Sequence, residues 1–128
     1  MAVFFQRILA LREKGALAFG VLGGLLWGAV AALRTRPLPA ALRVFTNAGP
    51  NIACAFLAAC LLMLGHRLLC RRSPSSAVLC AVLGGVFVLG VLSELFYWLV
   101  LGHGFDFADL FATLCALALE WLVLRRLA

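Results

Sequence analysis

One long stretch near the start of the chain, residues 15–33, carries no charged residue and reads GALAFGVLGGLLWGAVAAL. At 1.5 Å per residue, a helix over this stretch is about 28 Å long, which matches a hydrocarbon core of about 30 Å. The pattern therefore predicts a membrane-spanning helix. A basic start and the letters AVAA also suit a cleaved signal peptide, but the apolar stretch is longer than such peptides have, so we expect a retained helix.

Three more apolar runs follow, at about residues 44–65, 77–101 and 109–124. Notable interruptions of these runs are the polar residues Asn47, Asn51, Ser93, Glu94 and Glu120 and the proline Pro50. Because backbone groups in lipid must be hydrogen-bonded internally, helices are the expected form. We predict an all-α membrane protein, in which a single domain over residues 1–128 forms a four-helix transmembrane bundle. Residues 1–14 mix apolar and basic side chains and are expected to form a short interfacial helix.

The composition agrees with a membrane protein and excludes an ordinary soluble domain. Hydrophobic residues make up 66% of the chain and charged residues 12%, against about half and about a quarter in typical globular domains. The net charge of +6 does not indicate nucleic-acid binding. No basic stripe is interleaved with aromatic residues that stack on bases.

The basic residues flank the apolar runs and predict their orientation. With four spans, the two termini and the second loop share one side of the membrane, which holds eight of the eleven Lys and Arg residues. The opposite side holds Arg34, Arg36 and Arg43. The positive-inside rule then places both termini in the cytoplasm. We expect a multi-pass membrane protein, whose first partner is membrane lipid.

Small residues recur every four positions in the first run, at Ala16, Gly20, Gly24, Gly28 and Ala32. Such a stripe lets another helix approach closely. We expect it to pack within the bundle. The alternative is a homo-oligomer, or a membrane-protein partner, at the Gly20, Gly24 and Gly28 surface.

The five cysteines lie mostly inside apolar runs and show neither CxxC spacing nor a Cys/His ligand pattern. We interpret them as small packing residues rather than a disulfide framework or a zinc site. We expect no metal site, no cofactor and no catalytic group.

Two of the five acidic residues, Asp106 and Asp109, stand three positions apart before the fourth run. Asp106 is a natural N-cap and Asp109 sits in the first turn, where both oppose the positive end of the helix dipole. Capping alone is therefore one interpretation of this pair.

Other polar residues suggest a binding site. A carboxylate at the depth of Glu94 costs about 3 kcal/mol unless it faces the bundle interior. We predict a polar ligand-binding cavity that opens to the outer face and is lined by Arg43, Asn47, Asn51, Glu94, Tyr97, Asp106 and Asp109. One alternative is a buried Glu94–Arg43 pair that fixes helix register without a ligand. Another is that Glu94 is protonated, because burial disfavours a charged carboxyl group. Glu120, near the inner end, is expected to pair with Arg67 or Arg71.

The second half, LGVLSELFYWLVLGHGFDFADLFATLCALALEWL, resembles the C-terminal half of VanZ-like membrane proteins. The matching residues are Glu94, Gly102, Gly104, Asp106, Asp109 and Thr113. The segment NAGPNIACAFLAACLLML is similar to the helix with a polar start in that family. The chain departs from the family pattern at Tyr97, where the family often has Gln, and at His103, where it often has a basic residue. It also has Arg43 and Asn47 where a Lys or His begins the second helix of the family.

The resemblance implies a multi-pass protein of the bacterial cytoplasmic (inner) membrane. It also implies a role like that of the family prototype, which is associated with glycopeptide-antibiotic resistance. The function we expect is therefore non-enzymatic, with the outer cavity engaging a lipid headgroup or a cell-wall precursor. The alternative is a small oligomeric ion channel or transporter. A membrane-embedded enzyme that uses paired carboxylates is the third hypothesis, and it is favoured least because HExxH and Ser/His/Asp patterns are missing from the sequence.

Overall fold

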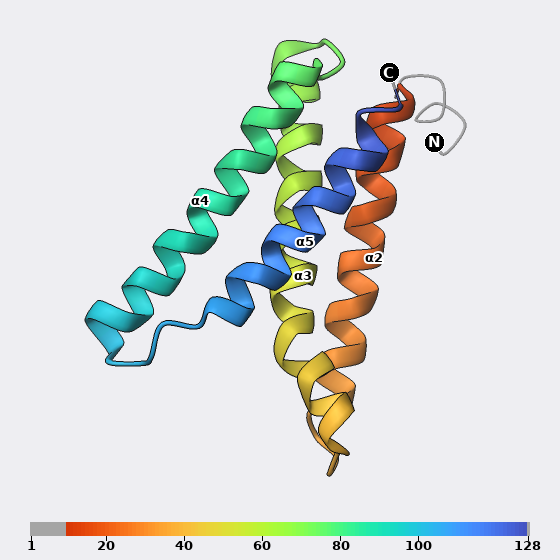
Figure 1. Ribbon diagram of the computed structural model, residues 1–128. Helices are drawn as coiled ribbons and strands as arrows, with labels where there is room; N and C mark the ends of the chain where they lie inside the picture. The colour runs from red at the N-terminus through yellow and green to blue at the C-terminus, as the bar shows by residue number, and fades with distance from the viewer. Residues whose placement is uncertain (1–9, 128) are drawn as a thin grey trace.

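The computed structural model describes residues 10–127 of the chain. It contains four α-helices: α2 (Leu11–Leu33), α3 (Ala40–Cys70), α4 (Ser76–Leu101) and α5 (Phe107–Leu124) (Figure 1). The described part contains no strand, and all four helices are long and apolar enough to cross a membrane. The predicted all-helical fold with four helices of spanning length is therefore confirmed.

The helices extend beyond the apolar runs that predicted them. The first helix begins at Leu11 rather than near residue 15, and α3 is 31 residues long, from Ala40 to Cys70, rather than spanning about 44–65. Charged residues such as Arg12, Arg43 and Arg67 are helix formers, so charge marks where the apolar run ends and not where the helix ends. Residues 11–14, expected in a separate interfacial helix, belong to α2; residues 1–9 lie outside the described residues.

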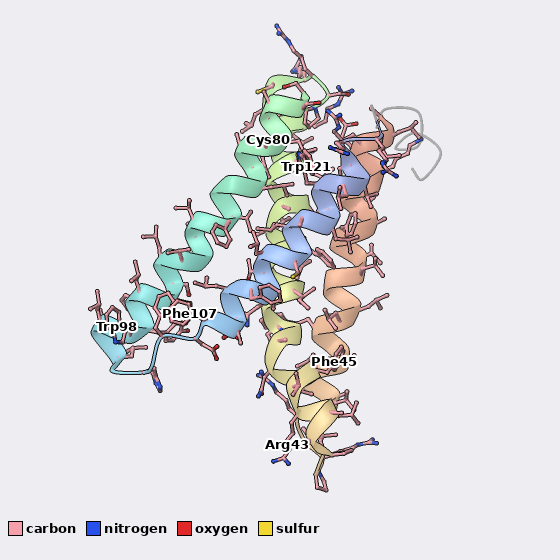
Figure 2. All side chains as sticks on the ribbon, in the orientation of Figure 1. Arg43, Phe45, Cys80, Trp98, Phe107 and Trp121 are labelled. Atoms are coloured by element: carbon pink, nitrogen blue, oxygen red, sulfur yellow. The ribbon has the colours of Figure 1, made fainter. Side chains whose placement is uncertain are left out.

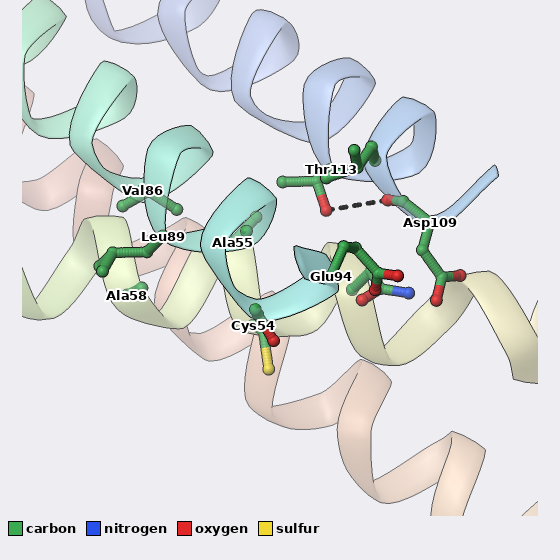
Figure 3. A pocket seen from close by; sticks show the side chains of 12 residues that line it. Cys54, Ala55, Ala58, Val86, Leu89, Glu94, Asp109 and Thr113 are labelled. Atoms are coloured by element: carbon green, nitrogen blue, oxygen red, sulfur yellow. Dashed lines mark hydrogen bonds between the residues drawn. The ribbon is translucent and has the colours of Figure 1, made fainter. Parts of the chain in front are cut away.

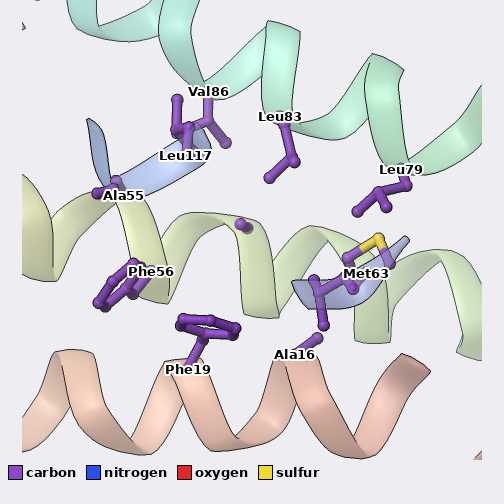
Figure 4. Close-up of a cluster of buried hydrophobic side chains, with 12 residues drawn as sticks. Ala16, Phe19, Ala55, Phe56, Met63, Leu79, Leu83, Val86 and Leu117 are labelled. Carbon is purple, nitrogen blue, oxygen red and sulfur yellow. The ribbon is translucent and has the colours of Figure 1, made fainter. Parts of the chain in front are cut away.

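The core lies where α2, α3, α5 and the N-terminal half of α4 meet. Phe19 of α2 packs against Phe56 of α3 with ring centroids 5.0 Å apart, and Met63 is fully buried nearby (Figure 4). Helix α5 crosses α3 and reaches α2 with its C-terminal end (Figure 1). Large apolar side chains such as Trp98 and Phe107 stay on the outer surface (Figure 2), which suits a lipid environment better than water.

Helix α4 packs differently from the others. Its buried residues, Leu79, Leu83 and Val86, all lie in its N-terminal half, and the helix diverges from α3 towards its C-terminal end (Figure 1). This divergence leaves the second half of α4 without close neighbours except around the start of α5. The opening created there holds the polar cavity described below.

The glycines of α2 divide between two surfaces. A Cβ atom on Gly20 would lie 2.5 Å from Cys60 Sγ, and one on Gly23 would lie 2.9 Å from the Ala53 carbonyl oxygen. These two glycines therefore permit the close approach of α2 to α3. Gly24 and Gly28 have no described atom within 4 Å of such a Cβ. They are open to lipid or to a second copy of the chain.

Pro50 lies inside α3 and lacks the backbone N–H that would bond to the Thr46 carbonyl. Arg34 fills this vacancy, because its Nη2 donates to the Thr46 carbonyl oxygen at 3.0 Å. The contact fixes the end of α2 against α3. Arg34 therefore has a structural role in the fold.

Candidate functional site

A cavity of about 230 Å³ lies between α3, α4 and α5. Asn51 and Cys54 line it from α3, Ser93 and Glu94 from α4, and Asp109 and Thr113 from α5, together with apolar residues. Figure 3 shows the Glu94 and Asp109 carboxyl groups at one end of this cavity and Val86 and Leu89 at the other. The cavity is therefore amphipathic, with its polar atoms gathered near the start of α5.

The connection between α4 and α5 positions the two carboxylates. Gly102 adopts a left-handed conformation with φ of +69°, which ends α4 and reverses the chain. The Asp106 side chain then accepts hydrogen bonds from the backbone N–H groups of Ala108 at 2.8 Å and Asp109 at 3.4 Å. Glu94 Oε2 accepts from the Asp106 backbone N–H at 3.3 Å. The end of α4 is thereby joined to the start of α5.

The helix dipole also favours this arrangement. Asp109 lies in the first turn of α5, where the partial positive charge of the helix terminus stabilises anions. Asn51 of α3 lines the same cavity as Asp109, and Thr113 Oγ1 donates to the Asp109 carbonyl oxygen at 3.0 Å. The Thr113 hydroxyl proton is thus used within its own helix.

Hydrogen-bond acceptors and negative charge dominate the polar end of the cavity. Between residues 10 and 127, no Lys or Arg side chain lies within 4.0 Å of the Glu94 or Asp109 carboxylate. The ion pair seen in this part of the chain joins Arg67 to Glu13, at the other end of the molecule. Neither carboxylate is neutralised by a close basic side chain. The cavity is suited to a ligand that brings N–H or O–H donors or a positive charge.

The structure brings together only some of the residues predicted to line one cavity. Asn51, Glu94 and Asp109 meet, and their role in ligand binding stays a prediction. Asp106 lies beside them through its backbone contact with Glu94, but its side chain caps α5 and is not among the residues that line the cavity.

Arg43, Asn47 and Tyr97 lie elsewhere. Arg43 and Asn47 line a separate hollow with Arg34 and Arg36, and Tyr97 packs edge-on against His103 with ring centroids 6.4 Å apart. Arg43 stands eight positions before Asn51, which is about 12 Å along α3, and it points away at the α2–α3 end (Figure 2). The alternative of a Glu94–Arg43 ion pair is not found among the described residues.

Three polar lining residues, Cys54, Ser93 and Thr113, were not predicted as part of the site. The sequence held a signal for each. Ser93 adjoins Glu94, while Cys54 follows Asn51 by three positions and Thr113 follows Asp109 by four, spacings that place each pair on one helix face. A cysteine in an apolar run is more often a packing residue. Cys54 was therefore interpreted as one and was not assigned to the cavity.

The opposite end of the molecule contains the other two acidic residues, both fully buried. Arg67 Nε lies 3.8 Å from Glu13 Oε1, and the expected pairing of Glu120 with Arg67 or Arg71 is not found among the described residues. Helix α3 packs most extensively along α2, which brings Arg67 to the carboxylate on α2 instead. In the described structure, neither Glu120 carboxylate oxygen has a hydrogen-bond partner.

The capping role of Asp106 yields a first test. Replacing Asp106 with Ala should lower the free energy of unfolding by about 1 kcal/mol, because two N–H groups at the start of α5 lose their acceptor. Asp106→Asn keeps an acceptor oxygen and should cost much less. Unfolding in mixed micelles measures both, and equal losses in the two variants would argue against the cap.

No protein-family model, curated protein or solved structure matches the chain. The resemblance to VanZ-like proteins accordingly stays a prediction that rests on the residues quoted above.

Proposed function

We propose that this chain is a VanZ-like, non-enzymatic protein of the bacterial inner membrane that crosses the bilayer four times, with both termini in the cytoplasm. The start of α2, the α3–α4 connection and the end of α5 lie at one end of the molecule (Figure 1). The basic residues of the first helix start, second loop and C-terminus belong to that end. The positive-inside rule supports placing it in the cytoplasm.

In this orientation the polar cavity opens towards the outer surface, and its function is to hold the polar head of a membrane-resident ligand. The observation that carries this proposal is the meeting of Asn51, Glu94 and Asp109, from three helices, around one cavity. Two carboxylates without a close basic partner are unfavourable to retain in an apolar protein. A ligand that supplies the missing donors would offset that cost.

The chemistry of the lining selects among headgroups. Carboxylate and amide oxygens accept hydrogen bonds, so the cavity favours a primary ammonium or a hydroxyl-rich group and disfavours a phosphate. An ethanolamine headgroup and an amino-bearing cell-wall precursor both carry such donors. A choline headgroup carries the same charge but has no N–H donor.

Lipid binding to purified protein tests this proposal. We expect the chain to bind short-chain phosphatidylethanolamine more tightly than phosphatidylcholine, as measured by native mass spectrometry. Glu94→Gln and Asp109→Asn should each weaken ethanolamine binding about tenfold. This is the change in affinity expected when one hydrogen bond between charged groups is lost.

Asp106→Asn is the matched control, because it removes a nearby charge but keeps the cap and does not alter a lining side chain. Equal binding of both lipids by the unchanged chain, or an equal effect of all three substitutions, would contradict the proposal. If liposomes containing the protein instead show ion or proton flux that requires Glu94, the channel or transporter alternative is favoured.

A further inference from the structure

A second hollow, of about 470 Å³, lies at the α2–α3 end of the molecule. Its polar lining consists of Arg34, Arg36, Arg43, Thr46 and Asn47. Among residues 10–127, no acidic side chain lines it. The hollow therefore has the opposite electrostatic character to the cavity at the start of α5.

The three arginines are not equivalent. Arg34 donates to the Thr46 carbonyl oxygen and so belongs to the fold. Arg36 and Arg43 are exposed, and neither guanidinium has a carboxylate within 4.0 Å in the part of the chain that the structure describes. Two planar, fork-shaped donors therefore line one hollow without an anionic partner.

The walls of the hollow are held in place by the fold. Pro37 and Pro39 restrict the backbone of the connection between α2 and α3. At the next turn, Gly49 lies so close to Val30 that an added Cβ would stand 2.6 Å from its Cγ2. Because the two helices are in contact here, the backbone positions of the arginines are set before any ligand binds, which lowers the entropy lost on binding.

The position of these arginines is unusual for a membrane protein. In the orientation proposed above, all three lie on the outer side, where basic residues are depleted. Because the spanning helices end here, we expect lipid phosphates at the level of this end. An anion bound at the hollow would explain why three arginines are concentrated there.

We propose that Arg36, Arg43 and Asn47 form a binding site for a phosphate group at the outer membrane surface. Guanidinium groups bind phosphate oxygens through paired N–H donors, and the Asn47 amide adds a further donor. The phosphate belongs either to a lipid headgroup or to a soluble phosphate compound. The proposal goes beyond the function of the acidic cavity, because it concerns different residues and holds even if that cavity binds nothing.

The test uses the full chain in uncharged detergent and two probes, inorganic pyrophosphate and short-chain phosphatidylglycerol. We expect saturable binding by native mass spectrometry. Arg36→Gln and Arg43→Gln should each weaken it about fivefold, the change for one basic contact with a membrane phosphate. Arg126→Gln removes the same charge from an exposed position at the opposite end and should leave the affinity unchanged.

The two probes distinguish the sources of the phosphate. Binding of both, with the same dependence on Arg36 and Arg43, supports a site for the phosphate group itself. Binding of phosphatidylglycerol alone supports a lipid headgroup site. Absence of saturable binding of either probe, or an equal loss in Arg126→Gln, would overturn the proposal.

A double substitution of arginine by lysine tests the proposal if the glutamine variants fail to fold. Arg36→Lys with Arg43→Lys preserves the charge but removes the fork geometry, so the protein should fold and bind more weakly than the unchanged chain. Unchanged affinity in this variant would also overturn the proposal.

Discussion

Replacing Gly23 with alanine should destabilise the protein by about 2 kcal/mol, whereas the same change at Gly24 should stabilise it by about 1 kcal/mol. A Cβ at Gly23 would lie 2.9 Å from the Ala53 carbonyl oxygen and 3.1 Å from Phe56 Cβ. Backbone atoms cannot move aside alone, so α2 and α3 must separate along their shared interface. At Gly24 nothing described lies within 4 Å, and alanine gains its better helix propensity.

The two variants differ by one position and have the same composition, so they serve as controls for each other. Reversible unfolding in mixed micelles, followed by circular dichroism, measures the difference. Equal stabilities would mean that α2 and α3 do not approach as closely as the structure has them.

Replacing Arg12 with methionine should lower the free energy of unfolding by about 3 kcal/mol. Arg12 is buried and donates to the carbonyl oxygens of Pro74 at 2.7 Å and Leu124 at 3.1 Å. It therefore joins the start of α2 to the α3–α4 connection and to the C-terminal end of α5. Its positive charge also interacts favourably with the negative end of the α5 dipole.

Lys14→Met provides the matched control, because Lys14 is exposed and loses the same charge. It should change stability by less than about 0.5 kcal/mol. The same unfolding assay measures both variants. If the losses are similar, net charge rather than the buried hydrogen bonds holds this end together.

The sequence predicted the helices well because apolar runs of spanning length have few other structural solutions. The helix bounds were less predictable, since Arg12, Arg43 and Arg67 end an apolar run without ending a helix. The divergence of α4 could not be predicted. It depends on which face of α4 packs, and α4 is apolar almost all round, so hydropathy does not distinguish its faces.

The candidate site was likewise predicted from the sequence in part. Capping chemistry placed Asp106 and Asp109 correctly at the start of α5, because a cap is a local feature. The meeting of Asn51 with Asp109 agrees with the predicted inward polar faces. Arg43 was assigned to the same cavity from its helical spacing. Spacing gives the face and not the depth along the helix, and the structure places Arg43 in a different hollow.

Cys54 gives the most direct test of whether hydrophilic side chains from three spanning helices meet in a cavity open to the outer surface. Cys54 lines the cavity and is exposed. A variant with Cys54 as its only cysteine should react in intact cells with a membrane-impermeant cationic methanethiosulfonate reagent. It should react more slowly with an anionic one, because Glu94 and Asp109 attract the cation.

A variant with Cys80 as its only cysteine is the control, since Cys80 lies near the N-terminal end of α4, at the end proposed to face the cytoplasm, and should not react from outside. Faster reaction of Cys54 with the cationic reagent, reduced by Glu94→Gln, is the predicted result. Reaction of Cys54 only after the membrane is opened, or at the rate of Cys80, would contradict the account.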